Sequence, residues 1–455
     1  MKKIHLILCF SIMFFLLFYD ESAGINLALL GAVYSIVIYA LTPKFLRSER
    51  LKVMLIFSLV SCGAFAYYGY FISFFAIVIS VFLLRLFSLS KELKPILTIP
   101  LAMGQGLSFP FRFFSFKEWL PKTNTEICVQ KVLAVVVIPS AFLMVFFAIY
   151  TYESDTFAIF FGNINFNFNI YEVLAISFLG FFIAFNVWNI TIPSFIYSSN
   201  HHFRNDFVNE DIAQKPTFDF LDLNLERLSG VVSLLLLNVM LVFFLFSFNY
   251  EQFYVGESSA AELSGATHER VNAVILSIIM AVLVIMFYFK SNFNFDNQAV
   301  WLRRLVYIWI LLNMLLVFSA LIKNLEYVTE LGLTYKRLGV FGFLLMALLG
   351  LALTFYKIYK RKTNLFLVNT MLWAFYGIVL ACCMVNWGSL ATRYNLENNK
   401  GSFDYLKSLN FNDDILKEVD PNFEKYTTSY YFSETASSSF LSKNIYYETL
   451  SKQKP

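Results

Sequence analysis

The chain has 455 residues, of which 58% are hydrophobic and 15% are charged, and its formal net charge is +4. Soluble domains are usually about 45–50% apolar and about 25% charged. This much apolar surface cannot be buried in one aqueous core, so lipid is the expected solvent. The five cysteines form no CxxC pair, which argues against a zinc knuckle or a thioredoxin-like motif. The sequence contains no basic stripe of the kind that would indicate nucleic acid as a partner.

Eleven hydrophobic runs predict membrane-spanning helices, because most approach the length of about 20 residues that crosses a bilayer. In chain order they are 4–19, 24–42, 51–67, 69–87, 132–150, 170–190, 229–248, 271–289, 304–322, 338–356 and 365–385. The expected fold is therefore all-α. A polytopic transmembrane helical bundle of about eleven spans (1–385) precedes a small extracytoplasmic helical tail (386–455).

The first run resembles a signal peptide, since Lys2 and Lys3 precede it and a small-residue stretch, 22–24, follows it. Asp20 and Glu21 fit a cleavage region poorly, and a second span begins almost at once. We therefore favour a retained helical hairpin over a cleaved signal.

The connections between spans carry three further signals. Residues 67–70 (YYGY) predict a tight turn with interfacial tyrosines. Residues 95–121 contain four prolines, so an uninterrupted helix is not expected there. Within them, 111–119 mixes aromatic and cationic residues, as a segment lying on the inner leaflet would. The apolar segment 156–169 is also expected to be interfacial.

The placement of Lys and Arg predicts the orientation. With the N-terminus inside, 23 of the 35 Lys and Arg residues fall in inner segments and four in outer loops, and the rest lie in the tail. Positive residues accumulate on the cytoplasmic side. We therefore expect a bacterial inner-membrane protein with a cytoplasmic N-terminus and a periplasmic or extracellular C-terminus.

Ionisable residues are missing from the centres of the eleven runs. Such groups are costly in a bilayer and usually mark ion or proton pathways, so a proton-coupled pump is disfavoured. The polar residues inside spans are expected to form interhelical hydrogen bonds, with a substrate groove as the alternative. They include Asn186, Asn189, Asn238, Asn272, Asn313 and Asn369.

His201 and His202 lie near Asp206, Glu210 and Asp211 in a predicted inner loop. These residue types bind metals, but their spacing matches no defined site, so a solvated loop is preferred. We predict no metal ligand, no cofactor and no catalytic residue.

Polar residues gather instead at the predicted outer ends of the helices. Since cations there oppose the insertion bias, Arg270, Arg337 and Arg393 are expected to have carboxylate partners. Two interpretations are open: a polar clasp that docks the tail onto the helices, or a functional outer pocket. The candidate outer-face polar cluster consists of His268, Glu269, Arg270, Glu326, Glu330, Thr334, Tyr335, Arg337, Arg393, Tyr394, Asn395 and Asp404.

The tail is expected to form short helices. Ser402 or Asp404 would cap a helix at 403–409, and Asn412 or Asp413 one at 414–419. A segment of this size cannot bury much core by itself, so it is expected to rest on the membrane domain.

Three motifs carry a family resemblance. The run 330–340 (ELGLTYKRLGV) resembles a YGLTxLRxxV element, 391–396 (ATRYNL) is similar to IARYNL, and 404–409 (DYLKSL) is similar to LDYLxxLS. These elements are typical of an uncharacterised bacterial membrane family, the domain of unknown function 4173 type, related to the 4153 type. The resemblance is good over about 225–420, although Lys336 and Glu330 depart from the pattern. The family has no established activity, so the resemblance implies an architecture without a mechanism.

Three functions remain open. The favoured one is a non-catalytic membrane component: a scaffold, sensor or assembly partner that contacts another membrane or periplasmic protein through its tail. The first alternative is a transporter or lipid-translocating permease. The second is a membrane enzyme acting on a lipid-linked substrate at the outer face, with Glu326, Glu330 or Asp404 as base. A wide polar cavity would favour the permease, and paired carboxylates in a groove the enzyme.

Overall fold

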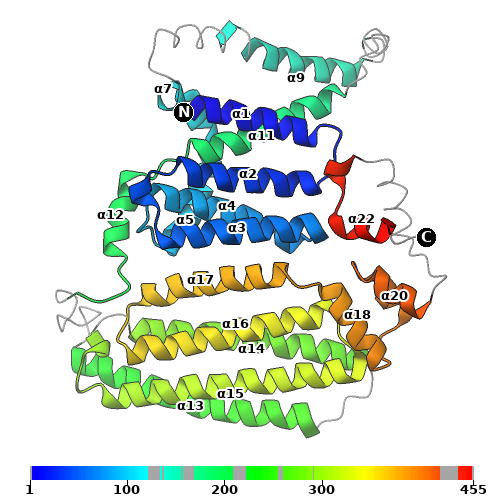
Figure 1. Ribbon diagram of the computed structural model, residues 1–455. Coiled ribbons are helices and arrows are strands. Elements are labelled where there is room, and N and C mark those ends of the chain that lie inside the picture. Colours follow the sequence, from blue (N-terminus) through cyan, green and yellow to red (C-terminus); the bar gives the residue numbers. More distant parts are fainter. Residues whose placement is uncertain are drawn as a thin grey trace.

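The computed structural model describes most of the chain (Figure 1). The described residues are 3–120, 134–135, 138–154, 157, 169–208, 222–254, 260–289, 292–420 and 439–452. Within these ranges the secondary structure is helical, apart from one isolated bridge between Asp206 and Lys362. The prediction of an all-α fold is therefore confirmed.

The first half of the chain forms one group of helices, called here the N-terminal layer (Figure 1). Its main helices are α1 (Lys3–Phe18), α2 (Ile25–Leu41), α3 (Glu49–Tyr68), α4 (Phe71–Leu89) and α11 (Ile170–Trp188). Their shared core contains Phe10, Tyr34, Phe87 and Trp188, all buried. Between α3 and α4 the chain reverses at Gly69, whose φ of +68° favours glycine. The tight turn predicted at 67–70 is thus confirmed.

The proline-rich segment is broken into short pieces, as expected. They are η2 (Pro95–Leu97), α5 (Thr98–Leu107), α6 (Phe109–Phe114) and α7 (Phe116–Trp119). Arg112 anchors this segment to the end of α11, because its guanidinium donates to the Asn189 carbonyl oxygen at 3.1 Å and to the Asn186 side chain. Beyond it lie α9 (Ile138–Glu153) and α12 (Ser194–His202). Most of 156–169 lies outside the described residues.

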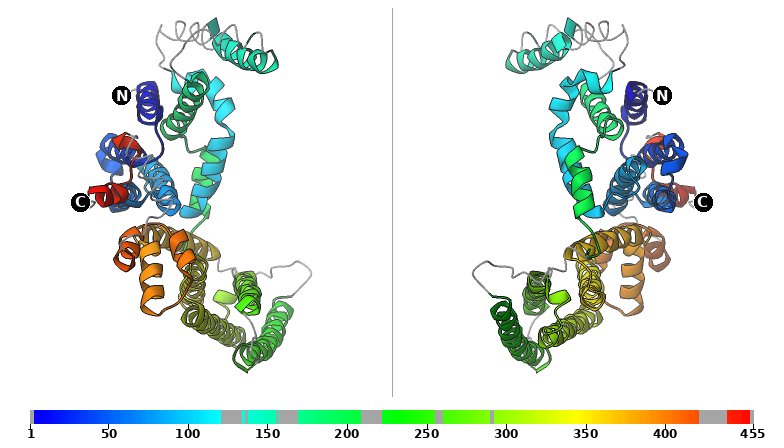
Figure 2. Two further views of the ribbon diagram at one scale, coloured as in Figure 1. Left: turned by 90° about the vertical axis from the view of Figure 1, so that its right-hand side faces the viewer. Right: turned by 90° about the vertical axis from the view of Figure 1, so that its left-hand side faces the viewer.

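The second half forms the C-terminal layer. It contains α13 (Leu223–Tyr254), α14 (Ala260–Tyr288), η5 (Asn292–Asn294), α15 (Val300–Leu331) and α16 (Tyr335–Tyr359). The following helix, α17 (Asn364–Cys383), lies between the two layers (Figures 1 and 2). It places Tyr376, Leu380 and Cys383 in the core of the N-terminal layer, so α17 joins the two layers along its length.

Each of the eleven hydrophobic runs lies largely or wholly within one helix. By length and composition, seven of the described helices could cross a membrane: α3, α4, α11, α13, α15, α16 and α17. Several helices extend beyond their hydrophobic runs. In particular α15 continues to Leu331, so Glu326 and Glu330 lie on its last turns and not in a loop.

Buried polar side chains connect helices. The hydroxyls of Ser35 and Ser58 lie 2.7 Å apart between α2 and α3, and those of Ser80 and Tyr376 lie 2.8 Å apart between α4 and α17. Asn238 donates to the Leu305 carbonyl oxygen at 3.1 Å. These contacts support interhelical hydrogen bonding as the role of these polar groups.

After α17 the chain forms a series of short helices. They are α18 (Trp387–Glu397), α19 (Phe403–Ser408), α20 (Asp413–Val419), η6 (Phe440–Ser442) and α22 (Ile445–Lys452). Ser402 caps α19 by accepting a hydrogen bond from the Tyr405 amide, as predicted. Asn412 precedes α20 but does not cap it; its side chain donates to Thr392 and to the Leu406 carbonyl oxygen instead.

Candidate functional site

Residues 386–420 and 439–452 cover one end of the helical bundle, called here the tail side, at the right of Figure 1. The cluster predicted from the sequence falls on this side where its side chains are described. Its centre is Asn395 of α18, which is only 1% exposed. The Asn395 side chain accepts from the Leu333 amide at 2.6 Å and donates to the Leu333 carbonyl oxygen at 2.9 Å. One amide thus satisfies both backbone groups of the residue that links α15 to α16.

Gly332 makes this clamp possible. Its φ of +87° is a conformation that side chains rarely adopt. A Cβ placed on Gly332 would lie 2.5 Å from Asn395 Oδ1. The glycine in the sequence GLT is therefore required both for the reversal of the chain and for the close approach of Asn395.

Arg337 stabilises the same turn from inside. It is 9% exposed, and its guanidinium donates to the Gly332 carbonyl oxygen and lies 3.9 Å from the centroid of the Tyr327 ring. Among the described residues no carboxylate forms a salt bridge with Arg337. The predicted carboxylate partner is thus replaced there by a carbonyl oxygen and an aromatic face.

Two more members of the predicted cluster join this turn. Thr334 caps α16 by accepting from the Arg337 amide at 3.3 Å. The Tyr335 amide donates to the Tyr405 hydroxyl at 3.3 Å, which ties α16 to α19. Tyr394 is half-buried and packs in the small core that contains Leu333 and Leu406.

The remaining members are not brought together. Arg393, Glu330 and Asp404 are exposed. Asp404 lies 4.0 Å from Lys407, and Glu326 lies 3.3 Å from Lys323, each within its own helix. The side chains of His268, Glu269 and Arg270 lie outside the described residues, although their backbone belongs to α14.

A second anchor holds the end of the chain on the N-terminal layer. The Ile25 amide donates to the Lys443 carbonyl oxygen at 3.0 Å, and a Cβ on Gly24 would lie 2.5 Å from the Ser442 backbone. The Tyr446 hydroxyl donates to Asp414 at 3.1 Å. Burial, followed by repulsion from Asp414 and Asp413, raises the pKa of Tyr446, so the phenol stays protonated and remains a donor.

Residues 386–420 and 439–452 therefore form an end cap with one anchor on each layer. α18 and α19 hold the α15–α16 turn, while η6 and α22 hold the turns that follow α1 and α3. An aromatic group, Tyr68, Tyr70, Phe411, Tyr446 and Tyr447, fills the space between these contacts.

Arg337→Ala is expected to lower the melting temperature of the purified protein in detergent. It removes a charge-assisted hydrogen bond and a cation–π contact, together worth about 2–3 kcal/mol. Arg393→Ala is the matched control, because Arg393 is exposed and its loss should change stability by less than about 0.5 kcal/mol. Equal melting shifts in the two variants would contradict the role given to Arg337.

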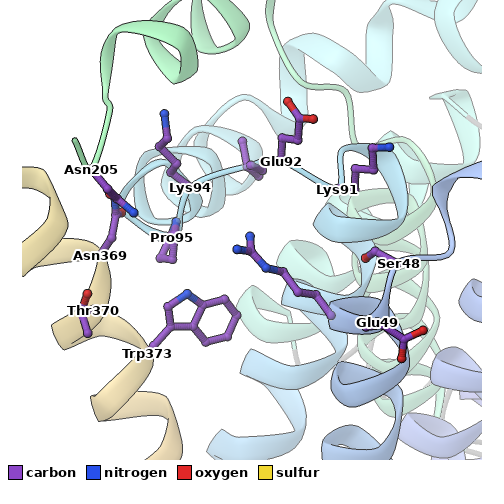
Figure 3. A pocket seen from close by; sticks show the side chains of 12 residues that line it. Ser48, Glu49, Lys91, Glu92, Lys94, Pro95, Asn205, Asn369, Thr370 and Trp373 are labelled. Atoms are coloured by element: carbon purple, nitrogen blue, oxygen red, sulfur yellow. The ribbon is translucent and has the colours of Figure 1, made fainter. Parts of the chain in front are cut away.

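A second feature lies at the opposite end of the bundle, called here the loop side. It is a cavity of about 530 Å³ between the start of α3, the connection from α4 to η2, and α17 (Figure 3). It is lined by Ser48, Glu49, Arg50, Lys91, Glu92, Leu93, Lys94, Pro95, Asn205, Asn369, Thr370 and Trp373. Both a cationic rim and an indole are therefore available to a ligand.

Asn369 fixes the wall of this cavity. Its side chain accepts from the Ile96 amide at 3.0 Å and donates to Asn205 Oδ1 at 2.9 Å. Lys94 donates to the Asn200 carbonyl oxygen. Partial burial, followed by repulsion from Arg204, lowers the pKa of Lys94. The sequence does not indicate this site, since its residues come from four distant segments that no spacing connects.

The seven long apolar helices, together with the end cap, define a membrane-embedded helical protein. The chain belongs to the family described as a domain of unknown function (DUF4153), whose family model matches residues 5–420. The matching family is the 4153 type, to which the 4173 type indicated by the sequence motifs is related. The match also covers the first half of the chain, outside the region of about 225–420 where the sequence resemblance is good. No curated protein and no solved structure matches the chain.

Proposed function

We propose that this protein is a non-catalytic multi-pass membrane component that acts as a scaffold, sensor or assembly partner. The observation that best supports this proposal is that the polar groups on the tail side bind other parts of the protein itself. Asn395, Arg337 and Tyr446 bind backbone atoms or neighbouring side chains of the protein. They hold the end cap in place, which favours the clasp over a functional outer pocket.

The membrane topology that goes with this proposal has about eleven spans. α1, α2, α9 and α14 join the seven longer helices, because each contains one of the predicted hydrophobic runs. The loop side carries the segments rich in Lys and Arg, so it would face the cytoplasm of a bacterial inner membrane. The tail, residues 386–455, would then form an extracytoplasmic domain. The finer 4173 assignment is part of the same proposal.

The exposed face of the end cap is the proposed contact for a second membrane or periplasmic protein. Arg393 and Asp404 are exposed on the end cap, and Glu330 is exposed at the end of α15 that the end cap covers. Charges of both signs on such a surface give specificity and faster association more than raw affinity. A partner would therefore be recognised by complementary charges.

A permease is the alternative that the structure also gives some support, because the loop-side cavity has charged side chains at its rim and lies between the N-terminal layer and α17. A membrane enzyme would need paired carboxylates, whereas Asp404 and Glu326 each lie beside a lysine of their own helix, at 4.0 Å and 3.3 Å respectively. We therefore rank the enzyme last.

Two measurements test the proposal together. The full chain, reconstituted in liposomes that contain fluorescent lipids, should translocate lipid no faster than protein-free liposomes. In cells, a photo-crosslinking amino acid at Arg393 should give one discrete adduct, whereas the same probe at Lys360 on the loop side should not. Lipid translocation that Trp373→Ala abolishes, with no adduct at Arg393, would instead establish the permease.

A further inference from the structure

The loop-side cavity has the charge and the position of a headgroup site. Its lining contains three cations, Arg50, Lys91 and Lys94, and two carboxylates, Glu49 and Glu92. Glu49 forms a salt bridge with Lys52 at 2.7 Å, and the Lys94 ammonium donates a hydrogen bond to the Asn200 carbonyl oxygen. The side chains of Arg50 and Lys91 form no hydrogen bond and no salt bridge with any residue that the structure describes. The lining therefore contains two cations, Arg50 and Lys91, and one carboxylate, Glu92, that form no salt bridge with a described residue.

The shape of the cavity adds to this argument. Its volume of about 530 Å³ lies within the range of about 300–1,000 Å³ of small-molecule sites. In Figure 3, Glu92 and Lys94 point upward, away from the Trp373 indole. The indole is half-buried and stacks on Phe87, with 5.8 Å between the two ring centroids. It therefore presents a fixed apolar surface beneath the charged rim. Indoles prefer the interface between headgroups and acyl chains.

We propose that this cavity binds the phosphate-bearing headgroup of an anionic phospholipid. Arg50 and Lys91 would hold the phosphate, since basic pockets between transmembrane helices on the cytoplasmic side bind such headgroups. Trp373, which is half-buried, would contact the glycerol backbone. Because the walls come from α3, the α4–η2 connection and α17, a bound lipid would stabilise the contact between the N-terminal layer and α17. This inference rests on the proposed orientation, in which the loop side faces the cytoplasm, and not on the proposed scaffold role.

The test uses the purified full chain in a neutral detergent and measures bound lipid by native mass spectrometry. The parent protein should bind phosphatidylglycerol more tightly than phosphatidylcholine. R50Q/K91Q should weaken phosphatidylglycerol binding by about fivefold for each cation removed, or roughly 25-fold in total. E92Q should strengthen it, because the opposing carboxylate is neutralised.

K44Q/K360Q is the matched control, since Lys44 and Lys360 are exposed cations that do not line the cavity. It should bind phosphatidylglycerol like the parent. Glycerol phosphate distinguishes the sources of the phosphate: displacement of the lipid by micromolar glycerol phosphate would assign the site to a soluble phosphate ester, and its failure would assign it to the lipid. Parent-like binding by R50Q/K91Q, or equal losses in both double variants, would overturn the proposal.

Discussion

Gly388→Ala should release α18 from the rest of the end cap. Gly388 is buried, and a Cβ at this position would collide with the Asn410 backbone carbonyl oxygen. A flexible side chain could move aside, but here the obstacle is backbone. The connection from α19 to α20 would therefore have to shift, at a cost of about 3 kcal/mol. We expect a lower melting temperature and faster proteolysis within 386–420.

Gly377→Ala provides the control for this substitution. Gly377 lies in the middle of α17, and nothing stands within 4 Å of the position that a Cβ would occupy. Alanine favours a helix more than glycine does by about 1 kcal/mol. The control should therefore be neutral or slightly stabilising. A Gly388→Ala protein that melts and resists protease like Gly377→Ala would show that α18 and Asn410 are not packed as described.

The second large effect is expected for Asn395→Asp, which keeps the shape of the side chain and removes its donor. The Leu333 carbonyl oxygen would lose its hydrogen bond and face a carboxylate. Leaving a buried polar group unsatisfied costs about 1–3 kcal/mol, and more when a charge is involved. The melting temperature in detergent should therefore fall. The amide hydrogens of the connection between α15 and α16 should also exchange faster.

Asn398→Asp is the natural comparison, since Asn398 directly follows α18 and lies three positions after Asn395. The Asn398 side chain is exposed and donates to the Tyr394 carbonyl oxygen of α18 at 2.8 Å. It should change stability by less than about 0.5 kcal/mol. If both variants were equally stable, the paired contact between Asn395 and Leu333 would not hold the end cap.

The helices themselves could be predicted from the sequence because their signals are local. Every apolar run coincides largely or wholly with a helix, and the prolines of 95–121 break the chain where expected. The cap at Ser402 depends on residues only three positions apart, so it too was predictable. The extension of α15 to Leu331 was missed, because polar residues such as Lys323 and Glu326 continue a helix beyond its apolar run.

The candidate site was predicted only in part, since it depends on distant contacts. Charge balance suggested a carboxylate for Arg337, but Gly332 reverses the chain so that a carbonyl oxygen and Tyr327 reach the guanidinium first. Asn395 was identified through its motif, whereas its partner, Leu333, carries no polar side chain to indicate the pairing. The loop-side cavity could not be predicted, because it forms only where α3 and α17 meet.

The second anchor of the end cap also affects how the protein is made. The Ser22 amide donates to the Ser442 hydroxyl across 420 residues of sequence. At about 5–20 residues per second, a ribosome needs roughly 20–85 s to produce that stretch. The turn between α1 and α2 therefore stays uncovered until Ser442 has been synthesised. During that interval the turn is accessible to proteases, and its contact with Ser442 marks a chain whose synthesis has passed that residue.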